Sequence, residues 1–174
     1  MTNALMVQRV WKSYAAGVQG CSARVWALRG CTLQVAMGER VGIVGRRGAG
    51  KTTFMHCLAG HRPVDAGRID TPLLSRCYLS STFDLERLPD LPPPSRVLVL
   101  VDLAPQGTGG AAYETLLTAA RVLAPITGAL IIAGPDVATV APLVDRVVLL
   151  QDGHLAELTR LPVRRVAERP PLAS

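Results

Sequence analysis

The feature that most constrains this chain is the glycine-rich stretch "GRRGAGKTT" at Gly45–Thr53. It fits the pattern G-x-x-x-x-G-K-[ST], in which glycines let backbone N–H groups curl around a phosphate chain without a side chain intruding. A helix that opens at Gly50 and Lys51 would point the positive end of its dipole at the same anion. Lys51 is expected to reach the β- and γ-phosphates, and the Thr52 hydroxyl to bind Mg²⁺.

The residues around this stretch provide the structural context that such a loop needs. "VGIV" at 41–44 has the pattern of a short buried strand, residues 51–59 that of a helix, and Gly60 that of a helix end. The chain alternates between further apolar strands and helices. Strands are expected at 4–10, 31–36, 96–101 and 129–133, and a helix at 111–124. This alternation predicts an α/β fold with a mainly parallel sheet.

The remaining segments set the domain organisation. Residues 137–144 indicate a broken helix, and Asp152–Gly153 the turn of a hairpin. "LPDLPPPS" at 88–95 is typical of a linker. We expect one nucleotide-binding domain over residues 1–160 and a loosely held basic, proline-containing tail over 161–174.

Composition restricts the class of protein. A chain of 174 residues with 49% hydrophobic residues can bury a real core. The net charge is +6, but the arginines are scattered and not interleaved with aromatic residues, which argues against a nucleic-acid partner. The four cysteines form no C-x-x-C pair and are predicted to be small apolar residues in a reducing compartment. The N-terminus has no signal-peptide pattern and the apolar runs are short, which predicts a cytoplasmic protein.

Two segments resemble the ATP-binding domain of ABC-type ATPases. Residues 28–69, which include "GRRGAGKTT" and "LAGHRPVDAGRI", resemble its first part, and "LVDRVVLLQDGHL" at 143–155 resembles its end. The resemblance implies a P-loop NTPase-like fold with an N-terminal antiparallel β-subdomain. It also implies ATP and Mg²⁺ as ligands, and a helical subdomain that carries a signature motif.

The resemblance further implies which residues form the site. Asp102, at the end of "VLVLVD", matches the Walker B aspartate that holds Mg²⁺ directly or through water. An aromatic side chain before the loop stacks on adenine in this family, and Tyr14 matches its place better than Trp26. Arg46 and Arg47 either add charge at the phosphates or point into solvent. The expected nucleotide-binding residues are Tyr14, Gly45, Arg46, Arg47, Gly48, Ala49, Gly50, Lys51, Thr52 and Thr53, and the expected metal ligands are Thr52 and Asp102.

The chain departs from the family pattern after the loop. Leu103 stands where ABC ATPases have the glutamate that polarises the attacking water, and an apolar side chain can neither orient water nor accept its proton. Residues 68–101 are too few to hold the helical subdomain, and no signature string occurs. Ser80 or Ser81 replaces the expected glutamine, Pro135 replaces the switch histidine, and "APQGTGG" lacks the bridging aspartate.

These losses predict a subunit of a larger complex that binds Mg-ATP but hydrolyses it weakly or not at all, in a structural or regulatory role. The expected partner is another ABC-type subunit or a component of a membrane complex, which would hold the chain at the inner face of the membrane. Two alternatives remain open. One is a compact active ABC-type ATPase that energises a membrane-associated or transport complex, with Asp136 as the base. The other is a small P-loop metabolite kinase.

Overall fold

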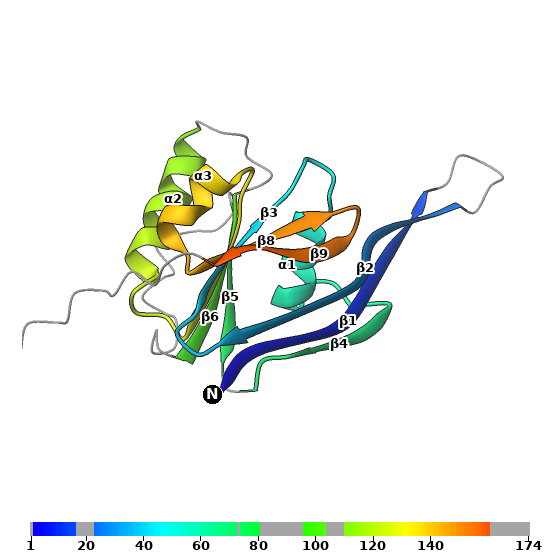
Figure 1. Cartoon of the computed structure of the whole chain (residues 1–174), viewed down its shortest axis with the longest axis horizontal. Helices are drawn as coiled ribbons and strands as arrows, with labels where there is room; N and C mark the ends of the chain where they lie inside the picture. The colour runs from blue at the N-terminus through cyan, green and yellow to red at the C-terminus, as the bar shows by residue number, and fades with distance from the viewer. Residues whose placement is uncertain (1, 17–22, 73, 81–95, 104–109, 161–174) are drawn as a thin grey trace, which may run out of the picture.

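The computed structural model describes residues 2–16, 23–72, 74–80, 96–103 and 110–160, which form two sheets with helices packed beside them (Figure 1). The smaller sheet has the order β2-β1-β4 and is antiparallel. The larger sheet has the order β5-β6-β7-β3-β8-β9 and is parallel except for β9. The predicted α/β fold with an N-terminal antiparallel β-subdomain is therefore confirmed.

The strands are divided between the two sheets, and the helices lie beside them. The strands of the smaller sheet are β1 (Asn3–Ala16), β2 (Ala23–Ala36) and β4 (Ala66–Asp70). Those of the larger sheet are β3 (Arg40–Val44), β5 (Ser75–Leu79), β6 (Val97–Asp102), β7 (Ala129–Ala133), β8 (Arg146–Gln151) and β9 (His154–Arg160). The helices are α1 (Lys51–Ala59), α2 (Ala111–Leu123), α3 (Val137–Val140) and the 3₁₀ turn η4 (Ala141–Leu143).

Most sequence predictions for these elements are confirmed. Helix α1 has the bounds expected from the glycine loop, and Gly60 ends it in the left-handed conformation at φ 80°. The β8–β9 hairpin turns at Asp152 and Gly153, both with positive φ. The broken helix appears as α3 followed by η4.

The prediction for β1 and β2 was too short, because both strands extend well beyond 4–10 and 31–36. Their outer halves pair with each other as a long ribbon, which continues away from the large sheet in Figure 1. Residues 23–26 of this ribbon are exposed. Without a buried face these residues lack the alternation of apolar and polar side chains by which a strand is recognised.

The core has two parts, one on each face of the large sheet. Strand β6 is buried throughout, and its side chains alternate between the faces. Leu98 and Leu100 pack on the face of α1, whereas Val99 and Val101 pack on the face of α2. This alternation decides where the side chains at the end of β6 point.

The cysteines of the described chain are core residues. Cys31, Cys57 and Cys77 are free thiols and are buried, as expected, and burial raises the pKa of Cys57 to about 11. Cys21, the linker at 88–95 and the tail at 161–174 lie outside the described residues. Within the described part of the chain, no helix is both long and apolar enough to cross a membrane.

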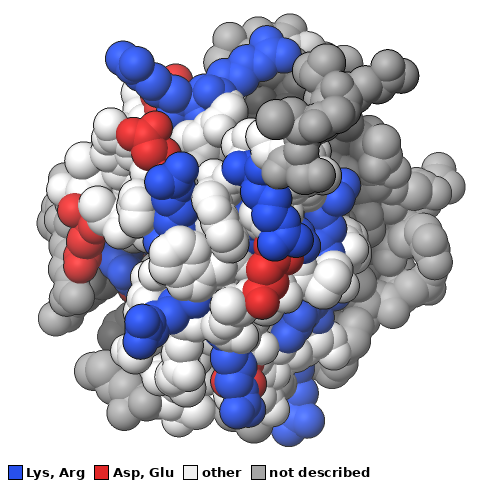
Figure 2. Space-filling view, turned by 90° about the vertical axis from the view of Figure 1, so that its right-hand side faces the viewer, with Lys and Arg blue, Asp and Glu red and all other residues white. Residues whose placement is uncertain are grey.

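The basic residues do not collect into one patch on the side of the β1–β2–β4 sheet. Figure 2 shows this side, where lysine and arginine side chains are spread among uncharged ones with a few acidic side chains between them. Some of the basic side chains form ion pairs, such as Lys12 with Asp65 at 2.8 Å and Arg68 with Asp70 at 2.7 Å. This distribution agrees with the scattered positions of the arginines in the sequence.

Candidate nucleotide-binding site

The glycine-rich loop joins the carboxyl end of β3 to the start of α1, in the middle of the large sheet. Strand β3 lies between β7 and β8, so the loop opens at the edge where ligands of parallel sheets bind. Gly50 has φ 104°, and a Cβ on it would collide with the carbonyl oxygen of Ala27. A Cβ on Gly45 would collide in the same way with the carbonyl oxygen of Leu150. The glycines therefore let the loop pack against β2 and β8.

Lys51 lies inside the loop rather than in solvent. Its side chain is buried, and Nζ donates hydrogen bonds to the carbonyl oxygens of Gly45 at 2.5 Å and Arg46 at 3.0 Å. Burial lowers the pKa of the Lys51 ammonium, and the charge of Asp102 opposes this shift. A phosphate that enters the loop would replace these carbonyl partners with a full negative charge.

Asp102 ends β6 on the face of α1 and is fully buried. Its Oδ2 accepts a hydrogen bond from the hydroxyl of Tyr78 on β5 at 3.1 Å. Burial, followed by the charge of Asp102, raises the pKa of Tyr78 well above its ordinary value. The sequence did not predict Tyr78, because a contact between residues on two different strands leaves no local pattern.

The two threonines of the loop lie at the first turn of α1. Thr52 and Thr53 are half-buried. The Tyr14 hydroxyl donates to Thr53 Oγ1 at 3.3 Å, and the guanidinium of Arg62 lies 5.5 Å from the centre of the Tyr14 ring. Trp26 instead packs edge-on against Trp11, with ring centres 5.5 Å apart. Of the two aromatic candidates, Tyr14 is the one joined to the loop helix.

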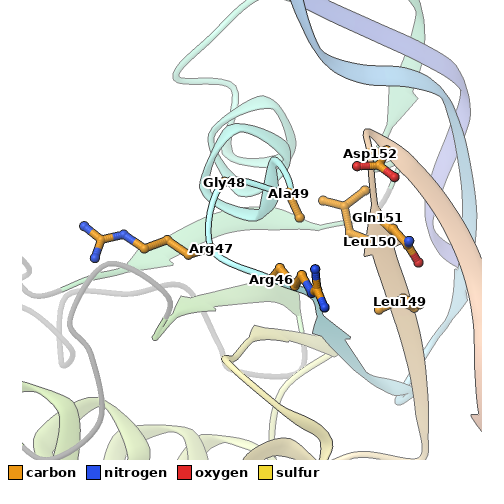
Figure 3. Close-up of a pocket in the computed structure, with 8 residues that line it drawn as sticks. All are labelled: Arg46, Arg47, Gly48, Ala49, Leu149, Leu150, Gln151 and Asp152. Carbon is orange, nitrogen blue, oxygen red and sulfur yellow. The ribbon is translucent and has the colours of Figure 1, made fainter.

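Arg46 and Arg47 are exposed and point in different directions. A pocket of about 520 Å³ lies beside the loop, lined by Arg46, Arg47, Gly48 and Ala49 on one side and by Leu149, Leu150, Gln151 and Asp152 on the other. Figure 3 shows the Arg46 side chain turned toward β8, whereas Arg47 extends away from that strand. The two arginines therefore lie on different sides of the loop.

The residues in the positions of the hydrolysis machinery have structural contacts of their own. Leu103 is buried among the side chains on the α2 face, and its N–H donates to the carbonyl of Ala133 at 2.9 Å. Asp136 is exposed and caps α3, where Oδ1 accepts from the Thr139 N–H at 2.9 Å. Pro135 is exposed. Ser81 and most of "APQGTGG" lie outside the described residues.

A glycine loop between a central parallel strand and a helix, with a buried lysine and a buried aspartate beside it, defines the P-loop class of nucleotide-binding folds. Comparison with solved structures supports this fold. The chain is similar to the ATP-binding cassette MJ0796 in a post-hydrolysis dimer, with a TM-score of 0.63 and 13% identity over 90% of this chain and 100% of the other. A nucleotide-free ATP-binding cassette from an ABC transporter gives a TM-score of 0.64 at 12% identity, over 91% of this chain and 92% of the other.

Sequence comparison shows which proteins of the P-loop class this chain resembles. The ABC transporter family profile matches residues 28–87. The phosphonates import ATP-binding protein PhnC 1 of Pseudomonas savastanoi pv. phaseolicola is 37% identical over 93 residues, which is 48% of this chain and 35% of that protein. The lipoprotein-releasing system ATP-binding protein LolD of Legionella pneumophila is 39% identical over 83 residues, 43% of this chain and 35% of that protein. The chain is therefore similar to ABC-type ATP-binding domains in sequence over residues 28–87, and to ATP-binding cassettes in fold. The chain spans about a third of the length of these curated relatives.

Proposed function

We propose that this chain is an ABC-type ATP-binding subunit of a larger complex, which holds Mg-ATP and by itself hydrolyses it little or not at all. The observation that carries the proposal is the end of β6. Asp102 lies on the face of the loop and of Lys51, whereas Leu103, at the position of the catalytic glutamate, is packed into the core on the opposite side.

The proposed binding groups are those around the loop. Backbone N–H groups of Gly45–Thr53 would surround the phosphates, and Lys51 would give up its carbonyl partners for the β- and γ-phosphates. A buried carboxylate and a hydroxyl fit Mg²⁺, which takes oxygen ligands and is usually bound with substrate phosphates. Thr52 and Asp102 would hold this ion, whose charge offsets that of the phosphates.

We propose that the Tyr14 ring stacks on the adenine of the nucleotide. We further propose that Arg46 and Arg47 contribute positive charge near the phosphates. Tyr14 supports this role because its hydroxyl is fixed on Thr53, the last residue of the loop. The two arginines support it because they are exposed at the loop itself. Trp26 is less suited, since its ring packs against Trp11.

Asp136 is not a favoured replacement for the catalytic glutamate. Its carboxylate already accepts a hydrogen bond from the first turn of α3. A general base must be able to approach the attacking water, so this cap would have to be disturbed or shared. We therefore place Asp136 in a structural role.

We propose the kind of complex that this chain joins from the names of its relatives. PhnC 1 is described as an import protein and LolD as part of a releasing system, and both are ATP-binding proteins. By analogy this chain would act with a second ABC-type subunit or with a membrane component, and reach the inner face of the membrane through it. Bound ATP would stabilise the folded chain against unfolding, by about 2.7 kcal/mol when its concentration is a hundred times its Kd.

Equilibrium binding of a fluorescent ATP analogue with Mg²⁺ tests this function. We expect saturable binding that Lys51→Ala abolishes and that Tyr14→Leu weakens roughly five- to tenfold, as expected for the loss of a stacking contact. Arg68→Ala, which removes an exposed charge on β4, is the matched control and should leave binding unchanged. Binding that survives in Lys51→Ala would contradict the assignment of the loop.

A further inference from the structure

Tyr78 is hydrogen-bonded to the carboxylate of Asp102, the residue that we propose as a ligand of Mg²⁺. Its hydroxyl donates to Asp102 Oδ2 at 3.1 Å. The accepting carboxylate is removed from water, because Asp102 is fully buried, and Tyr78 is half-buried. A hydrogen bond to an ionised carboxylate in such surroundings is stronger than one in water, and it fixes the orientation of the carboxylate.

The register of the large sheet explains why these side chains meet. Strands β5 and β6 are parallel, with Tyr78 opposite Leu100. Leu100 and Asp102 are two residues apart on β6 and therefore point to the same face, the face of α1. The Tyr78 ring packs against the core on that face, so its long side chain extends along the strands to the end of β6.

The far end of α1 holds the Tyr78 ring in place. The rings of His56 and His61 each lie edge-on to Tyr78, with ring centres 5.2 Å apart in both cases. Such edge-to-face contacts restrict an aromatic ring. The helix that begins with Lys51 therefore also supports Tyr78, through His56 in its last turn and through His61, two residues after its end.

We propose that Tyr78 is a positioning residue, which holds the Asp102 carboxylate in the orientation that binds the Mg²⁺ of the nucleotide complex. This inference rests on the proposed function. Groups that orient metal ligands govern metal affinity without touching the metal, and their loss commonly weakens it by 10- to 100-fold. Tyr78 would thus tie strand β5, which leads toward residues 81–95, to the metal side of the site.

The test measures Mg²⁺ dependence separately from nucleotide binding. A fluorescent ATP analogue is bound first in EDTA and then with increasing MgCl₂, and the Mg²⁺ concentration at half-effect is determined. For Tyr78→Phe we expect this concentration to rise about tenfold, while affinity for the analogue in EDTA stays within twofold. Tyr113→Phe on α2 makes the same chemical change on the opposite face of the sheet and should alter neither value.

Two further variants keep the result interpretable. In Asp102→Asn the additional change Tyr78→Phe should have little effect on the Mg²⁺ requirement, because the two residues act as a unit. His61→Ala removes an exposed ring that supports Tyr78, and we expect a two- to threefold higher Mg²⁺ requirement even if Tyr78→Phe does not fold.

Two results would overturn the inference while leaving the proposed function intact. One is a folded Tyr78→Phe protein with the Mg²⁺ requirement of the wild type, and the other is equal weakening with and without Mg²⁺. If the wild-type protein binds no nucleotide in either condition, the proposed function fails and this inference fails with it.

Discussion

Leu103 differs in direction as well as in chemistry from the catalytic glutamate whose place we propose that it takes. The alternation of β6 places Asp102 on the face of α1, while Leu103 lies on the other face among Ala120, Leu130 and their neighbours. The end of β6 therefore directs Asp102, the metal ligand that we propose, and the following residue to opposite faces of the sheet. Replacing the side chain alone would not restore a base at the phosphates.

We accordingly predict that Leu103→Glu fails as a gain-of-function variant. A carboxylate in this apolar cluster would cost about 3 kcal/mol or more of the free energy of unfolding, and the protein should gain no ATP turnover. Urea unfolding and phosphate release measure the two effects. Leu103→Met keeps the volume and should cost less than about 1.5 kcal/mol. A stable Leu103→Glu protein that turns over ATP would show that this position can face the nucleotide.

Asp65 provides a second prediction at the scale of a residue. Its carboxylate accepts hydrogen bonds from Lys12 Nζ at 2.8 Å, Ser13 Oγ at 2.7 Å and the Ser13 N–H at 2.8 Å. These donors, Lys12 first, hold the pKa of Asp65 well below its ordinary value of 3.8. A lowered pKa in the folded state stabilises the fold above pH 3.8, and this contribution is lost as the pH falls below that value.

Asp65→Asn should therefore lower the melting temperature by a few degrees at pH 7, and the difference from the wild type should narrow below about pH 4. Thermal melts between pH 7 and pH 3 measure this. Asp70→Asn is the matched control: its partner Arg68 has a side chain that is 74% exposed, and such a pair contributes little. A deficit for Asp65→Asn that is the same at every pH would contradict the account.

At the scale of the elements, the backbone conformation of the glycine loop restricts which residues can occupy it. Gly50 and Gly48 both have positive φ, 104° and 83°, but they differ in their surroundings. A Cβ at Gly50 would collide with the backbone of Ala27 on β2, whereas one at Gly48 would meet no described atom within 4 Å. Substitution at Gly48 therefore tests backbone strain alone, whereas substitution at Gly50 also tests steric collision.

Gly50→Ala should cost about 2 kcal/mol or more of the free energy of unfolding and abolish ATP binding, since β2 or the loop must move. Gly48→Ala carries only the strain of its backbone conformation, and we expect a cost of about 1 kcal/mol with ATP binding retained. Urea unfolding together with ATP titration distinguishes these outcomes. Equal effects of the two substitutions would mean that the contact with β2 does not hold the loop.

Some elements of this fold could be predicted from the sequence and others could not, for physical reasons. Helix α1 and strand β6 could be predicted because the glycines at the ends of α1 and the apolar run of β6 are local signals. The outer parts of β1 and β2 were missed, since they pair with each other and have no buried face. In the site, Lys51 and Asp102 follow from sequence patterns, whereas Tyr78 depends on the register of β5 against β6.

At the scale of the whole molecule, the described residues form two sheets in a fold similar to that of the ATP-binding cassette MJ0796. Residues 71–96, which include β5, connect β4 to β6, and the glycine loop follows β3 in the middle of the large sheet. In the function that we propose, Lys51, Thr52 and Asp102 would bind Mg-ATP, and the buried Leu103 would leave no carboxylate at that position to activate water. Our central claim is that this molecule holds ATP without breaking it.

The most direct test of this claim follows the bound nucleotide itself. The protein is loaded with Mg²⁺ and ATP labelled on the γ-phosphate, freed of unbound nucleotide, and sampled for intact ATP and released phosphate. We predict that the bound nucleotide stays ATP for hours, and that phosphate release under excess ATP is no faster than in Lys51→Ala. Prompt release of one phosphate per bound ATP, absent in Lys51→Ala, would contradict the account and identify a working ATPase.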